Sequence, residues 1–175
     1  MAYNLDIHRR SSIRLKEYDY SLEGDYFITI CTHRHECILG YIQDSAMQLN
    51  PFGRIAQACW EELPSHYPNV VLDEFCIMPN HVHGIIILTD QNPDVGARHA
   101  SPLQNMPVLG TVIGSFKSAS ARLINHLRGT LGSPVWQRNY YEHIIRSEKS
   151  LEAIQEYINA NPAQWAYDQD NPLNF

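Results

Sequence analysis

The 175-residue sequence contains no long hydrophobic run. Its β-branched apolar stretch at residues 84–88 is far shorter than the roughly 18 apolar residues of a membrane-spanning helix. The first residues include basic side chains, but no apolar segment follows them, so we expect no secretory signal. These absences predict a protein that acts in the cytoplasm and has no membrane partner.

Cysteine is scarce, and the four cysteines are scattered through strand-like and helix-like segments. Free thiols in a reducing compartment are the simplest interpretation of this pattern. With 44% hydrophobic and 18% charged residues, the composition is that of an ordinary globular protein. The length suits a single domain over residues 1–175, which can bury a substantial core.

Positive charge is also limited, because the formal net charge is −6. The basic side chains are nevertheless concentrated in residues 109–150, which carry six basic and two acidic residues, and in a weakly basic arm at residues 1–20. A locally basic segment fits phosphate binding on one face of a protein. It equally fits a solvated helix surface, so charge alone leaves both interpretations open.

The first half of the sequence alternates between strand and helix patterns. Runs of aromatic and β-branched residues predict strands, and an asparagine directly before a proline predicts a capped helix start. The predicted elements are a strand at 25–32, a hairpin at 37–50 that turns at Asp44 and Ser45, a helix from Pro51 to Pro64 capped by Asn50, and strands at 69–78 and 81–89 joined by a tight turn.

The second half begins with a polar segment, residues 90–108, whose proline and glycine content predicts a long mobile loop. Residues 134–146 are ambiguous, with a short strand first, and a last helix starts at Ser147 or Ser150 and ends at residues 159–162. A helix at 110–129 lies between them, and its predicted inward-facing residues are Val112, Ile113, Phe116, Leu123, Ile124 and Leu127.

The order of these elements predicts the fold class. A strand, a helix, two strands, a helix and a strand form an α+β fold, for which a ferredoxin-like sandwich is the natural candidate. Its antiparallel sheet would carry two helices on one face. The hairpin at 37–50 and the last helix would be additions to that core.

Two histidines begin the strand at 81–89. Because side chains alternate along a strand, His81 and His83 share one face, about 7 Å apart along the chain, and Val82 points the other way. Two imidazoles on one face can bind one cation. The same pattern also fits two partly exposed histidines at a strand end.

A second histidine-rich segment, "CTHRHEC", offers Cys31, His33, His35 and Cys37. The polar residues between the cysteines indicate a connection rather than one continuous strand, and the usual zinc spacing of paired cysteines is missing. This pattern therefore favours a loop over a metal site. A histidine-triad hydrolase is excluded because Ile85 occupies the third position, and no H-E-x-x-H motif is present.

Three segments together resemble a known family. "MPNHVHGIIIL" resembles the motif of the HUH endonucleases, and "VWQRNYYEHIIRSEKSLEAIQEYINANP" resembles the C-terminal half of the REP-associated tyrosine transposases. "RRSSIRLKEYDYSLEGDYFITICTHRHECILG" is similar to the N-terminal part of the same group. The resemblance implies a ferredoxin-like fold and cleavage and rejoining of single-stranded DNA at palindromic hairpin repeats. It also implies a 5′-phosphotyrosine intermediate and a required Mg²⁺ or Mn²⁺ ion.

The resemblance also implies residue roles. Tyr157 in "YINAN" corresponds to the nucleophile, and His81, His83 and Asn161 correspond to the metal ligands. Residues four apart on a helix share a face, so Tyr157 and Asn161 can approach one site together. Tyr140 and Tyr141 are rival tyrosines that we expect to pack or to stack on bases.

The expected partner is single-stranded or hairpin DNA, bound by a monomer or a homodimer. A domesticated hairpin-binding protein without cleavage, and a metal phosphodiesterase that uses water, are the alternatives. The expected DNA contacts are Arg9, Arg10, Arg14, Lys16, Lys117, Arg122, Arg128 and Arg138.

Overall fold

The structure is a computed structural model that describes residues 23–89, 108–168 and 170–174. The strands are β1 (Gly24–Cys31), β2 (Gly40–Gln43), β3 (Ala46–Leu49), β4 (Val70–Ile77), β5 (His81–Leu88) and β6 (Tyr141–Ile145). The helices are α1 (Pro51–Glu61), α2 (Leu63–His66), α3 (Leu109–Arg128) and α4 (Glu148–Gln164). The 3₁₀ turns are η1 (His33–His35), η2 (Trp165–Tyr167) and η3 (Pro172–Asn174).

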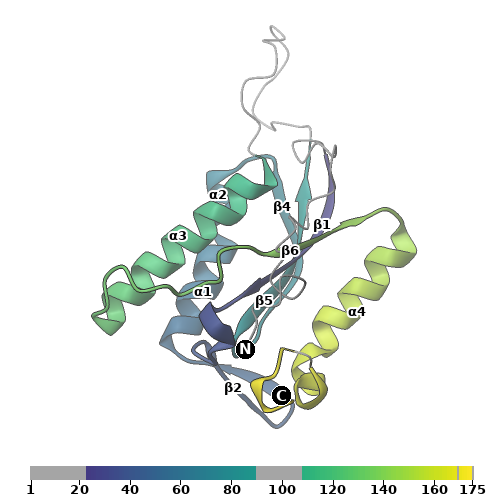
Figure 1. The fold of residues 1–175 in the computed structure, drawn as a ribbon. Coiled ribbons are helices and arrows are strands. Elements are labelled where there is room, and N and C mark those ends of the chain that lie inside the picture. Colours follow the sequence, from purple (N-terminus) through teal and green to yellow (C-terminus); the bar gives the residue numbers. More distant parts are fainter. Residues whose placement is uncertain (1–22, 90–107, 169, 175) are drawn as a thin grey trace, which may run out of the picture.

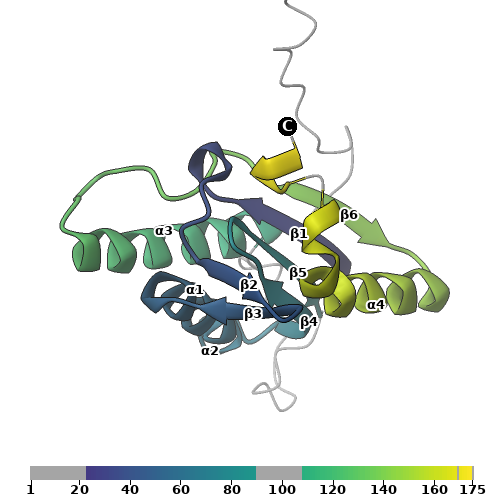
Figure 2. The ribbon, with the colours of Figure 1, turned by 90° about the horizontal axis from the view of Figure 1, so that it is seen from below.

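The central sheet has the strand order β4-β5-β1-β6, with every neighbouring pair antiparallel. Helices α1, α2 and α3 cover one face of this sheet, and α4 lies against the other (Figures 1 and 2). Strands β2 and β3 form a separate hairpin. This arrangement confirms the predicted α+β, ferredoxin-like sandwich with an added hairpin and a C-terminal helix.

The alternation of side chains along β1 and β5 creates a hydrophobic core on each side of the sheet. Tyr26, Ile28 and Ile30 belong to the larger core, with residues of α1 and α3. Ile85 and Ile158 belong to a smaller core between the sheet and α4. The smaller core holds α4 against the face on which His81 and His83 lie.

Gly84, directly after the histidine pair, is required by close packing. A Cβ atom at this position would lie 2.4 Å from Cζ2 of Trp60, whose ring is fully buried. The absence of a side chain therefore lets α1 approach the centre of β5, and the approach fixes the strand that carries the histidines.

Local sequence signals produced the predicted hairpin and helix start. Asp44 and Ser45 both have positive φ, as a two-residue hairpin turn requires. The Asn50 side chain accepts hydrogen bonds from the backbone amides of Phe52 and Gly53, which caps α1. Both predictions are confirmed.

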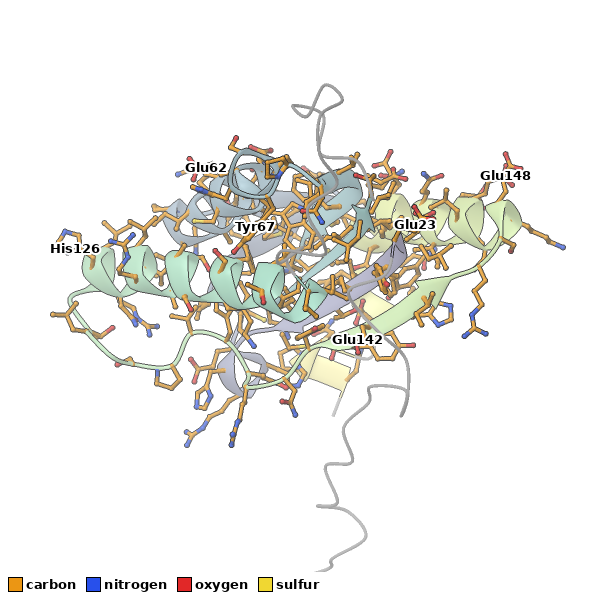
Figure 3. The ribbon with its side chains drawn as sticks, turned by 90° about the horizontal axis from the view of Figure 1, so that it is seen from above. Glu23, Glu62, Tyr67, His126, Glu142 and Glu148 are labelled. Atoms are coloured by element: carbon orange, nitrogen blue, oxygen red, sulfur yellow. The ribbon has the colours of Figure 1, made fainter. Side chains whose placement is uncertain are left out.

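Two predicted inward-facing residues of α3 are exposed instead, Leu123 at 41% and Leu127 at 55%. The end of α3, near the labelled His126, projects past the sheet, so its apolar side chains there have no layer to cover them (Figure 3). The predicted helix end at Pro64 is also wrong, because α1 stops at Glu61 and Pro64 lies in the first turn of α2.

The strand in residues 134–146 lies in the second half of that segment, as β6, and the first half contributes only an isolated bridge between Trp136 and Thr32. The last helix is capped by Ser147 and continues through Pro162 to Gln164. Asn161 is therefore helical.

The basic arm at 1–20 and residues 90–107 of the predicted loop lie outside the described residues. Within the described part of the chain, no helix combines the length and the apolar composition needed to cross a membrane.

Candidate active site

The histidine pair lies on β5, between β1 and β4, and faces α4. The two imidazole ring centroids are only 4.4 Å apart, and the side chains are almost fully buried. Burial lowers the pKa of both histidines to about 3, with smaller contributions from the repulsion of His81 by His35 and of His83 by His81. Both rings are therefore neutral near pH 7, and each has one nitrogen lone pair available as a ligand.

Asn80 fixes the tautomer of His81. Its amide nitrogen donates to the carbonyls of His35 (3.0 Å) and Asp170 (2.7 Å), so its Oδ1 is left to accept from Nδ1 of His81 at 2.9 Å. The lone pair of His81 is then on Nε2, a buried atom with no hydrogen-bond partner among the described residues. In metal sites, a hydrogen bond to the ring nitrogen that does not bind the metal typically orients the histidine in this way.

His83 is held between β1 and α4. Its Nδ1 lies 2.9 Å from Oγ1 of Thr29, its partner in the β1–β5 register, and its Nε2 lies 3.2 Å from the hydroxyl of Tyr157. The ring stacks on Phe27, with centroids 5.4 Å apart. If the Tyr157 hydroxyl donates to Nε2, His83 has the same tautomer as His81.

Tyr157 combines access with proximity to the histidines. Its side chain is 40% exposed, and its ring contacts Phe27 and His83 edge to face. Burial raises the pKa of the Tyr157 phenol, Asp168 adds to the rise, and a hydrogen bond with Asn161 opposes it. The hydroxyl is therefore protonated at neutral pH unless a positive charge is placed beside it.

Asn161 lies one helical turn beyond Tyr157 and is 2% exposed. Its Nδ2 donates to Oδ2 of Asp168 at 3.3 Å, and its buried Oδ1 has no hydrogen-bond partner among the described residues. The structure thus brings His81, His83, Tyr157 and Asn161 together.

Asp168 is a member of this cluster that the sequence did not indicate. One ring nitrogen from each histidine and one carboxylate oxygen of Asp168 all lie within 4.8 Å of one another. The C-terminal segment folds back over this end of the sheet, where Trp165 lies 6.0 Å from His81 between ring centroids (Figure 2). No motif spacing connects Asp168 to the histidines, so only the fold reveals the contact.

These donors fit a divalent cation. Two imidazole nitrogens, an amide oxygen and a carboxylate oxygen are ligands that Mn²⁺ accepts, and Mg²⁺ accepts the oxygens readily. Two of the donor atoms, Nε2 of His81 and Oδ1 of Asn161, are buried without a hydrogen-bond partner in the described residues. Such atoms are costly unless a ligand satisfies them.

The predicted DNA-contact residues that the structure describes do not lie in the cluster formed by His81, His83, Tyr157 and Asn161. Helix α3, which carries Lys117, Arg122 and Arg128, lies on the face of the sheet opposite to α4 (Figure 1). The Lys117 ammonium donates to the backbone carbonyls of Gln137, Arg138 and Asn139, which gives it a structural partner, and burial lowers its pKa.

Arg128 donates to Asn125 and to the carbonyl of Pro134, whereas the Arg122 and Arg138 side chains are exposed. Arg9, Arg10, Arg14 and Lys16 lie outside the described residues. Of the rival tyrosines, Tyr140 packs against the larger core, and Tyr141 is 45% exposed and contacts Phe27 edge to face.

Comparison with known proteins identifies two curated relatives from one organism. An uncharacterized protein of Haemophilus influenzae is 45% identical over 177 residues, covering 95% of this chain and 96% of that protein. A second Haemophilus influenzae protein, named "Putative REP-associated tyrosine transposase", is 27% identical over 150 residues, covering 85% of this chain and 76% of its own length.

Among solved structures, a REP-associated tyrosine transposase bound to a REP hairpin matches with a TM-score of 0.59 and 17% identity. The match covers 89% of this chain and 76% of that chain, and it shows that the fold is shared. No family model matches the chain.

Proposed function

We propose that the chain belongs to the family of the REP-associated tyrosine transposases and that it cleaves and rejoins single-stranded DNA at hairpin repeats, a proposal supported by its similarity to a protein of that name and by the shared fold. The proposed reaction makes a covalent 5′-phosphotyrosine link at Tyr157. The observation that carries the proposal is the 3.2 Å contact between the Tyr157 hydroxyl and His83. Beside it lie Nε2 of His81 and Oδ1 of Asn161, two buried lone-pair atoms without a hydrogen-bond partner among the described residues.

In the proposed reaction the Tyr157 oxygen attacks the scissile phosphorus. A bond between this oxygen and phosphorus forms, the bond from phosphorus to the 3′ oxygen breaks, and the phenol proton is released. The products are a 5′-phosphotyrosine and a free 3′-hydroxyl. Religation is the reverse attack by a 3′-hydroxyl on the same phosphorus.

The residues of this chain have separate tasks in that reaction. The ring of Tyr157 is positioned by edge contacts with Phe27 and His83, and its hydroxyl lies 3.2 Å from Nε2 of His83. His81, His83 and Asn161 would hold Mg²⁺ or Mn²⁺, with Asp168 as a further ligand. When bound, the cation would polarise the phosphate and stabilise the phenolate.

One chain supplies every proposed catalytic group, because Tyr157 contacts a histidine of its own chain. We therefore propose that a monomer contains a complete site. The proposed partner is hairpin DNA in the cytoplasm, by analogy with the neighbour that is bound to a REP hairpin. Arg122, Arg138 and the basic residues of the arm are the proposed phosphate contacts, and Lys117 supports the segment that carries Arg138.

The test is the formation of a covalent protein–DNA adduct on end-labelled hairpin oligonucleotides with Mn²⁺. The proposal predicts an adduct that requires Tyr157. Binding without cleavage under Mg²⁺ and Mn²⁺ would instead identify a domesticated binding protein, and cleavage that needs no Tyr157 would identify a phosphodiesterase that uses water.

A further inference from the structure

A second cluster of metal-binding side chains lies beside the proposed active site. It consists of Cys31 at the end of β1, His35 at the end of η1, and Asp170 in the C-terminal segment. One ligand atom from each of them lies within 4.8 Å of the others. Exposed Cys37 is not a member, so the cluster differs from the set that "CTHRHEC" suggests by sequence.

The distance between the His35 and Asp170 side chains is that expected between two atoms bound to the same metal ion, and the two side chains make no hydrogen bond with each other. Nδ1 of His35 lies 3.3 Å from Oδ1 of Asp170, yet this buried nitrogen makes no hydrogen bond within the described residues. Zinc bonds of about 2.1 Å to nitrogen and oxygen, in tetrahedral geometry, place two such ligands about 3.4 Å apart. The observed separation is close to that value.

The other ring nitrogen of His35 already has a partner. Nε2 of His35 lies 2.7 Å from the side-chain amide nitrogen of Gln137. Rotating the amide by 180° exchanges its nitrogen and oxygen; in that orientation Nε2–H of His35 donates to the Gln137 oxygen, and the lone pair is on Nδ1, facing Cys31 and Asp170. A metal-binding histidine typically has such an outer acceptor.

The backbone around the cluster is held in an uncommon shape. Arg34 and His35 both have positive φ, at 57° and 55°, which few residues other than glycine adopt. The Asn80 side chain donates to the backbone carbonyls of both His35 and Asp170. The two ligand-bearing segments are therefore joined by the same asparagine that orients His81.

We propose that Cys31, His35 and Asp170 form a second metal site, selective for Zn²⁺, that fastens the C-terminal segment to the end of β1. A thiolate, an imidazole and a carboxylate suit zinc, whereas Mg²⁺ avoids sulfur ligands. Binding exchanges the proton of the Cys31 thiol for the metal and releases it to water. The fastened segment also carries Asp168, so zinc would hold this carboxylate beside the histidine pair.

Cobalt titration tests this site directly. The full-length, untagged, reduced and chelator-stripped protein is titrated with Co²⁺, which reports a thiolate ligand by a charge-transfer band in the near ultraviolet. We expect one equivalent to produce the band and Zn²⁺ to remove it. Cys31→Ser abolishes the band, and Asp170→Asn weakens Co²⁺ binding at least tenfold. Cys37→Ser, in the same loop, leaves the band unchanged.

Several outcomes would overturn the inference. They are the absence of a band in the parent protein, a band that survives in Cys31→Ser, and a band lost in Cys37→Ser. Any of these would leave a contact between His35 and Asp170 beside a partly buried thiol, without a metal site. His81→Ala separates this inference from the proposed function, because it should abolish the DNA adduct and retain the cobalt band.

Discussion

The hydroxyl of Tyr157 lies 3.2 Å from Nε2 of His83, although the residues are 74 positions apart. The contact joins α4 to the centre of the sheet. The next residue, Ile158, packs in the smaller core and holds α4 in place there. Tyr157 thus packs against Phe27 and His83 on one side and remains accessible on the other. The proposed role of Tyr157 as a nucleophile for a large polymeric substrate requires this combination.

Asn80 should control metal affinity without being a ligand. Asn80→Ala removes the acceptor that fixes the His81 tautomer and leaves two backbone carbonyls without their donor. Loss of such an outer partner typically weakens metal binding about 10–100-fold. Mn²⁺ affinity measured by calorimetry should fall by that factor.

Asn125→Ala is the matched control for Asn80→Ala. Asn125 is also a buried asparagine that donates to a backbone carbonyl, but it lies on α3. This variant should lose stability and keep its Mn²⁺ affinity. Equal losses of affinity in the two variants would show that Asn80 acts only through general stability.

Gly84 should be intolerant of even a methyl group. In Gly84→Ala the new Cβ would meet the indole of Trp60 at 2.4 Å, so β5 or α1 must shift. Overpacking of this kind costs about 1–3 kcal/mol of the free energy of unfolding, which urea titration measures. Gly114→Ala, at an exposed position of α3 with no neighbouring atom within 4 Å, should instead stabilise by about 0.5–1 kcal/mol. A Gly84→Ala protein as stable as the parent would contradict the packing described for Trp60.

Mixing two inactive variants tests whether the site belongs to one chain. Tyr157→Phe lacks the proposed nucleophile, and His83→Ala lacks a proposed metal ligand. Because both groups come from one chain, the mixture should form no adduct with hairpin DNA. Recovery of a substantial share of the parent activity would show that α4 is exchanged between subunits of a dimer.

The sequence predicted those features that depend on local rules. Strand alternation placed His81 and His83 on one face, and Asn50 before Pro51 located the start of α1. It could not predict features set by tertiary contacts. Leu127 has the right helical phase for burial, but the sheet does not reach it. Pro162 suggested an early helix end, because proline lacks an N–H and its ring crowds the preceding turn, yet α4 continues to Gln164 and buries Asn161.

The sequence also predicted some residues of the proposed site and missed others. The family resemblance placed Tyr157 and Asn161, and the fold brings both to the histidines. Asp168 and Asp170 lie in a polar C-terminal segment without a motif. Their relation to His81, His83 and His35 depends on the path of the chain after α4, and local patterns do not encode that path.

The most direct measurement is the adduct assay on Tyr157→Phe, with Tyr141→Phe as the matched control. Tyr157 is partly exposed and its ring is retained in the variant, so the protein should fold as the parent does. With Mn²⁺ and a labelled hairpin oligonucleotide, denaturing gels should show an adduct for the parent and for Tyr141→Phe, and none for Tyr157→Phe. An adduct or equal cleavage with Tyr157→Phe would show that another nucleophile performs the reaction.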